Sequence, residues 1–239
     1  MKLNNGVEIP NIGLGTWLID NNEIENIVKK AIEIGYVHID TAEAYLNEEG
    51  IGRGISNFDR SKLFITSKIK AEYKTYESCK KAIDESLKKL NTDYIDLMLI
   101  HAPQPWNEFR ESDNHYFKEN LEVWTSLEDA YIEGKIKAIG VSNFHIDDLE
   151  NIISNCRIKP MVNQVLAHIG QVPFDIINYC KEHDIVVEAY SPIAHGQSYR
   201  IDTINEISKK YHKSNACICL KYLQQLGLVV LPKASSYEH

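Results

Sequence analysis

The chain has 239 residues, of which 44% are apolar and 25% are charged, and it carries a formal net charge of -8 with a pI near 5.6. This length suits one sizeable core, and the acidic balance, with no run of Lys and Arg, disfavours binding to nucleic acid or to an anionic membrane surface. The N-terminus has no apolar signal region and no segment has the roughly 18 consecutive apolar residues of a membrane span, so we expect a cytoplasmic protein with a small-molecule partner.

Short, β-rich apolar runs alternate along the chain with longer segments of helical periodicity. The runs predicted as strands are 11–17, 36–40, 63–69, 94–100, 136–142, 161–165, 185–190 and 228–231. The segments predicted as helices are 23–34, 77–90, 118–133, 146–154, 173–182 and 202–225. Strands separated by helices pair in parallel through right-handed crossovers. Eight such units predict an α/β fold, a (β/α)₈ TIM barrel that takes up residues 1–239 as a single domain.

The two ends of the chain carry expectations of their own. Asn5-Gly6 between Leu3 and Val7 predicts a β-hairpin over residues 2–10 that plugs the barrel floor. After the last predicted strand only residues 233–239 remain, too few for a covering helix. We therefore expect the last helix to be missing, the chain to be truncated, and two residues of 228–231 to form an exposed apolar flank. The expected state is a monomer or a weak homodimer.

The five cysteines, Cys79, Cys156, Cys180, Cys217 and Cys219, are odd in number and include no C-x-x-C pair. Neither a disulfide framework nor a metal site is indicated. We interpret them as core thiols of a reducing compartment.

Polar residues close nearly every predicted strand, at the end where barrel enzymes place their active sites. Taken singly, each has a structural interpretation: Asp40 as a helix cap, Lys68 as a solvated strand end, His101 as a loop histidine. A barrel has no structural need for all of them at one rim, and their burial is costly. The set therefore favours function. Its members end seven strands: Asp40, Lys68, His101, Asn143, Gln164, Ser191 and Lys233.

The segment 40–52, DTAEAYLNEEGIG, resembles the D-T-A-x-x-Y-x-N-E signature of the aldo-keto reductase family. Further segments similar to family motifs follow in order: GLGTW at 13–17, ITSK at 65–68, DYIDL at 93–97 with His101, IGVSNF at 139–144, Asn163-Gln164, AYSP at 189–192 and VLPK at 230–233. The resemblance spans essentially the whole chain. It implies an NADPH-dependent aldehyde or ketone reductase of the bacterial, diketogluconate reductase-like type.

The resemblance implies a catalytic set of Asp40, Tyr45, Lys68 and His101. Hydride transfer to a carbonyl creates an alkoxide that needs a proton and electrostatic stabilisation. Tyr45 would be the general acid, with Lys68 lowering the pKa of its phenol and Asp40 holding Lys68 in its charged form. His101 would donate a hydrogen bond to the substrate oxygen and orient it.

The family roles also imply a cofactor site. Ser142, Asn143 and Gln164 would bind the nicotinamide carboxamide, and Tyr190 would stack on the ring. Lys233 would pair with the 2′-phosphate of NADPH, although Ala234 replaces a common serine, so that NADH stays possible. The full set of predicted cofactor residues is Thr16, Trp17, Asp40, Ser142, Asn143, Gln164, Tyr190, Ser191, Ile193, Lys233 and Ser236.

The carbonyl substrate is expected to meet Tyr45 and His101 beside an aromatic wall of Trp17, Trp106 and Tyr116. The polar segment 103–116 suits a loop that sets specificity, whereas Trp124 lies on an apolar helical stripe and is interpreted as core. His168 stands where the family pattern is broken and is interpreted as structural.

Two rival interpretations remain open. One is a redox-sensing subunit that binds the cofactor with little turnover, against which the intact catalytic set argues. The other is a phosphate-binding barrel isomerase, which needs a Gly-rich loop after the seventh or eighth strand. The segment 191–196, SPIAHG, is a poor match for such a loop.

Overall fold

The computed structural model describes residues 1–234, in which eight parallel strands follow one another in chain order around one sheet. They are β1 (Leu14–Gly15), β2 (His38–Asp40), β3 (Phe64–Ile69), β4 (Leu97–Ile100), β5 (Ile139–Ser142), β6 (Val162–Leu166), β7 (Val186–Tyr190) and β8 (Val229–Leu231). Single parallel bridges, Ile12 with Val230 and Gly15 with Lys233, join β8 to β1. The predicted (β/α)₈ barrel and all eight predicted strands are confirmed.

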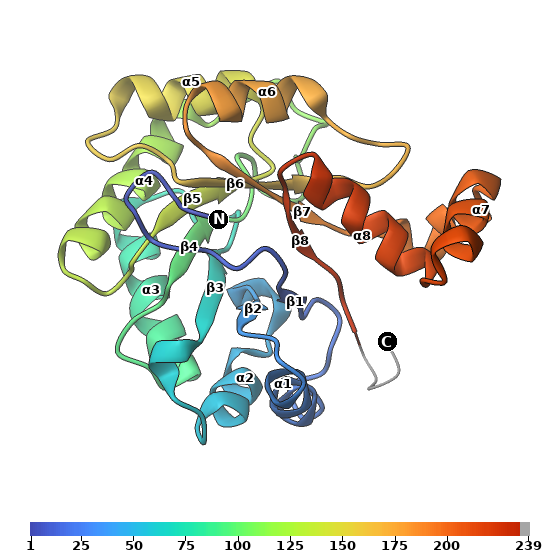
Figure 1. Cartoon of the computed structure of the whole chain (residues 1–239). Helices are drawn as coiled ribbons and strands as arrows, with labels where there is room; N and C mark the ends of the chain where they lie inside the picture. The colour runs from blue at the N-terminus through green and yellow to red at the C-terminus, as the bar shows by residue number, and fades with distance from the viewer. Residues whose placement is uncertain (235–239) are drawn as a thin grey trace.

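The helices surround the strands, as Figure 1 shows. They are α1 (Ile24–Glu33), α2 (Glu48–Ile55), α3 (Tyr76–Leu90), α4 (Phe117–Ile132), α5 (Ile146–Asn155), α6 (Phe174–Glu182), α7 (Asp202–Tyr211) and α8 (Asn215–Gln225), with 3₁₀ turns η1 (Glu43–Tyr45), η2 (Arg60–Lys62) and η3 (Ala194–Arg200). Covered by helices on the outside, the apolar strand residues are buried on both faces of the sheet. Among residues 1–234 no helix combines the length and the apolar character needed to cross a membrane.

The N-terminal hairpin is confirmed. An antiparallel bridge joins Lys2 to Glu8, and Leu3 N–H donates to the Val7 carbonyl at 2.8 Å. The Asn4 side chain donates to the Pro160 carbonyl at 3.0 Å and the Asn5 side chain to the Lys137 carbonyl at 2.9 Å. Both acceptors precede strands, so the hairpin closes the amino-terminal end of the barrel and leaves the other end for the site.

Helix α2 was not predicted, because three glycines in eight residues make its sequence a poor intrinsic helix former. The structure gives them a packing role between α1 and α3. A Cβ atom added at Gly52 would lie 2.6 Å from the Lys89 carbonyl oxygen and 2.9 Å from the Leu90 carbonyl carbon. Tertiary packing therefore overrides propensity here, and α2 holds the turn that carries Tyr45 against the barrel.

Replacing Gly52 by alanine should destabilise the fold, by about 1–3 kcal/mol for overpacking against backbone atoms. Alanine improves helix propensity by only about 1 kcal/mol, so the net free energy of unfolding should fall or, at the lower limit, stay level. Urea denaturation measures the change, with Glu49→Ala on the exposed face of the same helix as control. A Gly52→Ala variant clearly more stable than the parent chain would contradict the close packing.

The single predicted helix over 202–225 is wrong: the structure has α7 and α8 there, projecting to one side of the barrel (Figure 1). His212 adopts a left-handed φ of 51° that ends α7. Ser214 then caps α8, accepting a hydrogen bond from Cys217 N–H at 3.2 Å. A serine cap signal inside a helical period therefore starts a new helix.

The expected apolar flank at the last strand is also wrong. Leu228, Val229, Val230 and Leu231 are all buried, with at most 4% of any of them exposed. Helix α8 packs beside β8, and the fully buried Leu223 belongs to this helix. The outward side chains of the strand therefore do not meet water.

Candidate active site

The predicted site residues gather at the carboxyl-terminal end of the barrel around a cavity of about 680 Å³. Of these residues, Thr16, Trp17, Asp40, Tyr45, His101, Trp106, Ser142, Asn143, Gln164, Tyr190, Ser191, Ile193 and Lys233 all line it. Lys68 lies beneath the lining, and Ser236 lies outside the described residues. Gly15, Ala44, Pro192, His195 and Leu231 complete the wall.

Lys68 is buried in an ion pair below the cavity floor. Its Nζ lies 2.7 Å from Asp40 Oδ1 and donates a second bond to the Thr41 carbonyl at 2.8 Å. Burial alone would lower the pKa of Lys68, but the opposing effects, led by attraction to Asp40, outweigh burial and raise the pKa above its ordinary value. Lys68 is therefore a fixed cation, and Asp40 holds it as expected.

Tyr45 lies between this cation and His101. Lys68 Nζ is 5.1 Å from the centre of the Tyr45 ring, and the His101 ring meets it edge to face at 5.5 Å. Burial raises the pKa of Tyr45, and the opposing effect of Lys68 does not cancel it. Lys68 lowers the pKa of the Tyr45 phenol, as expected, but burial has the larger effect. At neutral pH the phenol carries its proton, as a general acid must.

The turn that carries Tyr45 is anchored on both sides. The carboxylate of Glu43, which is buried, lies 3.5 Å from Lys70 Nζ and accepts a bond from the Tyr73 hydroxyl at 3.3 Å. The Asn47 side chain accepts from the Thr41 hydroxyl at 2.7 Å and donates to the Thr16 carbonyl at 2.9 Å. These contacts link η1 to β1, β2 and β3 and so fix where the phenol points.

His101 is held neutral at the cavity wall. Burial, followed by repulsion from the Lys68 cation, keeps its pKa well below the ordinary value. A neutral imidazole still has one N–H to donate. The Trp106 ring packs edge to face on His101 at 5.1 Å and restricts its orientation.

Four predicted cofactor residues face this pair from β5, β6 and β7. The Ser142 hydroxyl donates to the Gln164 carbonyl at 2.9 Å, and the Tyr190 hydroxyl donates to Asn143 Oδ1 at 2.8 Å. The Asn143 side-chain amide donates to the His101 carbonyl at 3.0 Å. Amide groups and a half-buried aromatic ring thus share one side of the cavity.

The remaining cofactor candidates also line the cavity. The Thr16 hydroxyl donates to the Asp40 carbonyl at 2.9 Å. Trp17, 47% exposed, faces the His195 ring edge to face at 6.1 Å. Lys233 is exposed and donates to the Leu18 carbonyl at 3.2 Å. Lys233 therefore contributes a cation to the cavity lining.

The loop between β4 and α4 is organised by Gln104. Its amide donates to the carbonyls of Ser112 and Asn114 and accepts from Arg110 N–H, at 2.8, 2.9 and 2.9 Å. The loop brings Trp106 to the cavity as expected but turns Tyr116 away, since Tyr116 donates to Glu108 instead. Arg110, which the sequence did not single out, donates to the Asn143 carbonyl at 2.6 Å.

Beneath the cavity the structure adds a buried group that the sequence analysis missed. Glu188 of β7 accepts a bond from Gln164 Nε2 at 2.9 Å, and its other oxygen lies 3.9 Å from His38 Nε2. A charged residue within the apolar run VVEAY was the available signal. Trp124, 1% exposed, is core as predicted. No cluster of His, Cys, Asp or Glu in residues 1–234 has the arrangement of a metal site.

A cavity of about 680 Å³ above a buried Lys–Asp pair, at the carboxyl ends of the strands, defines the class: a barrel with the active-site position of a (β/α)₈ enzyme. The chain belongs to the aldo/keto reductase family, whose model matches residues 11–239.

Named relatives agree with this membership. Glyoxal reductase of Bacillus subtilis (strain 168) is 42% identical over 98% of this chain and 82% of its own length. Methylglyoxal reductase DkgA of Escherichia coli (strain K12) is 37% identical over 98% of this chain and 82% of its own length.

Solved structures are equally similar. An aldo-keto reductase from a Medee basin deep-sea metagenome library has a TM-score of 0.92 and 40% identity, covering 100% of this chain and 85% of its own. The Bombyx mori aldo-keto reductase in complex with NADP has a TM-score of 0.88 and 34% identity, covering 100% and 84%. The predicted family and the prediction of an oxidoreductase enzyme are confirmed, and the enzyme is favoured over the redox-sensing subunit.

Proposed function

We propose that this aldo-keto reductase reduces small aldehydes and ketones to alcohols with hydride from NADPH, dicarbonyls such as glyoxal and methylglyoxal among its substrates. The observation that carries the proposal is the Lys68–Asp40 ion pair under the Tyr45 ring, open to the cavity beside His101. The names of the relatives, a glyoxal reductase and a methylglyoxal reductase, support the substrate class.

The residues of this chain account for the proton side of the reaction. When bound, NADPH would be the source of the hydride that the carbonyl carbon takes up. As the C–O π electrons move onto oxygen, the Tyr45 hydroxyl transfers its proton there and an O–H bond forms. Lys68 stabilises the phenolate that remains, and Asp40 keeps that cation in place. His101, neutral by burial, donates a hydrogen bond that orients the carbonyl oxygen.

The cavity also fits a nicotinamide cofactor. The carboxamide of the ring has both donors and acceptors, and Ser142, Asn143 and Gln164 present hydroxyl and amide groups on one side. Tyr190 would stack on the ring, and Ser191 and Ile193 would follow the pyrophosphate. Lys233 would hold the 2′-phosphate, and Trp17 and Thr16, which also line the cavity, would contact the cofactor.

The wall beside Tyr45 favours uncharged substrates. Trp17, Trp106 and Ala44 give it an apolar character. Within the described part of the chain, the cavity lining contains one acidic residue, Asp40, and one basic residue of the Lys and Arg type, Lys233. Asp40 is already paired with Lys68. A substrate carboxylate next to the reacting carbonyl would find no free cation, so small neutral carbonyls fit best.

Oxidation of NADPH with a panel of neutral aldehydes, ketones, dicarbonyls and keto acids tests the proposal. Turnover should be highest with small neutral carbonyls and dicarbonyls. A protein that quenches its fluorescence with NADPH but turns over none of the panel would instead be a cofactor-binding sensor. Highest activity with keto acids would contradict the proposed substrate class.

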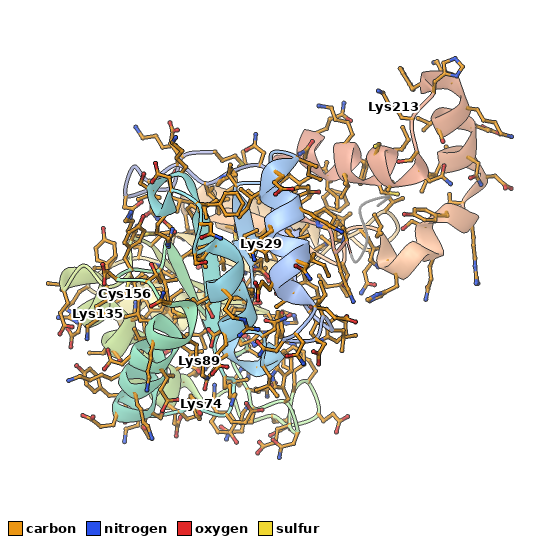
Figure 2. All side chains as sticks on the ribbon, turned by 90° about the horizontal axis from the view of Figure 1, so that it is seen from below. Lys29, Lys74, Lys89, Lys135, Cys156 and Lys213 are labelled. Carbon is orange, nitrogen blue, oxygen red and sulfur yellow. The ribbon has the colours of Figure 1, made fainter. Side chains whose placement is uncertain are left out.

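The cofactor preference depends on Lys233. Its ammonium would meet a phosphate that NADPH has and NADH lacks, so Lys233→Met should weaken NADPH roughly 10- to 100-fold and leave NADH nearly unchanged. Fluorescence titration with both cofactors measures this. Lys213→Met is the matched control, since Figure 2 shows Lys213 at the far end of the arm formed by α7 and α8. Equal weakening of both cofactors would place Lys233 away from the 2′-phosphate.

A further inference from the structure

Gln164 and Glu188 form a buried pair on neighbouring strands behind the cavity. They are register partners of β6 and β7, and each is at most 2% exposed. Gln164 Nε2 donates to Asp40 Oδ2 at 2.8 Å and to Glu188 Oε2 at 2.9 Å. One amide nitrogen thus joins two carboxyl groups.

This arrangement fixes which end of the Gln164 amide faces the ligand. An amide nitrogen has two hydrogens, and the two carboxyl oxygens accept both. Turning the amide over would set its oxygen against the carboxylate of Asp40, which can only accept, and lose the bond to Asp40 Oδ2. In residues 1–234 no donor bonds to Gln164 Oε1, and this oxygen is not sealed inside the protein, because Gln164 lines the cavity.

We propose that Glu188 is a positioning residue that locks the Gln164 amide with its oxygen toward the cavity, so that the site selects an N–H donor from the nicotinamide, the carboxamide NH₂. The proposal rests on the nicotinamide placement given above. Asp40 alone would take one hydrogen of the amide and leave the side chain free to turn about that bond. The second carboxyl group removes this freedom.

The protonation of the buried cluster suits this role. Burial, with a smaller contribution from Asp40, raises the pKa of Glu188 to about 8, against the lowering effects of its Gln164 hydrogen bond and of Lys68. The neighbouring His38 has a pKa lowered by burial to about 3, so it does not take the proton. A neutral Glu188 still accepts at its carbonyl oxygen and adds no third charge below Tyr45.

The test compares NADPH with its 3-acetylpyridine analogue, in which an acetyl group keeps the carbonyl and removes the NH₂. Fluorescence titration should show that the parent protein binds the analogue roughly 10-fold more weakly, the typical effect of one lost hydrogen bond. In Glu188→Met, whose side chain is similar in length and apolar, the ratio of the analogue Kd to the NADPH Kd should be close to one. Glu188→Gln, whose amide oxygen can accept the same bond, should restore the ratio. Glu128→Gln, a buried carboxyl on α4 bonded to Arg157, is the distant control and should leave it unchanged.

Each outcome decides the proposal. An undiminished ratio in Glu188→Met overturns the role of Glu188 and leaves the nicotinamide placement intact. A ratio of one in the parent protein contradicts both the role of Glu188 and the nicotinamide placement. If Glu188→Met does not fold, Glu188→Ala, which also lacks the acceptor, takes its place: a ratio near one supports the lock and an undiminished ratio contradicts it, while loss of discrimination in Glu188→Gln contradicts the lock in either case.

Discussion

Tyr45→Phe should lower kcat by roughly 10²- to 10⁴-fold, the usual contribution of a general acid, while NADPH binds almost as in the parent protein. The substitution removes only the hydroxyl, and the ring keeps its contacts with His101 and Lys68. No other described side chain combines a proton to give at neutral pH with a place between these two residues. Single-turnover kinetics with methylglyoxal and fluorescence titration with NADPH measure the two quantities separately.

Tyr94→Phe is the matched control for this substitution. Tyr94 donates to the Arg60 carbonyl at 3.2 Å and packs against the cations of Arg60 and Lys137, near the amino-terminal end of the barrel. Its loss should change turnover little. Near-normal turnover in Tyr45→Phe would show that another group donates the proton.

The barrel could be predicted because its signals are local. Each strand is a short apolar run bounded by polar residues, and a polar side chain at the carboxyl end of such a run lies at the active-site rim whatever the loops do. Asp40, Lys68 and Gln164 are cases of this kind. The order of the strands around the barrel then brings these three positions to the same end of the barrel.

Features that depend on packing could not be predicted in the same way. Helix α2 exists because Gly52 allows close contact with α3, which no propensity scale includes. The direction of the pKa shift of Tyr45 depends on how deeply the phenol is buried, and a sequence gives the neighbours but not the burial. Arg110 reaches Asn143 only through the conformation of a long loop.

Glu188 could be predicted only in part. The strand alternation places it on the same face as Tyr190, two residues later, so a carboxyl group inside the barrel could have been predicted. Its partner could not, because the bond to Gln164 depends on the register of β6 and β7. Residues of one face of adjacent strands should therefore be compared across the predicted sheet as well as along each strand.

Lys68→Met should reduce both turnover and stability, and a second substitution should separate the two effects. Without the cation, Asp40 is left buried with Gln164 as its side-chain donor, so the free energy of unfolding should fall by about 3–5 kcal/mol. Turnover should fall by roughly 10² or more, because nothing then stabilises the Tyr45 phenolate. Lys29→Met, which breaks a partly exposed pair with Glu25 on α1, is the control and should cost less than about 1 kcal/mol.

The double variant Lys68→Met with Asp40→Asn distinguishes stability from chemistry. Removing both charges leaves no unpaired buried ion, so most of the lost unfolding free energy should return. Turnover should stay low, because the missing cation acts on the phenolate during the reaction and a neutral asparagine does not replace it. Urea denaturation and single-turnover kinetics on the same preparations give both quantities. Recovery of turnover together with stability would mean that Lys68 serves only to hold Asp40 in the fold, and the proposed role of the cation under Tyr45 would be wrong.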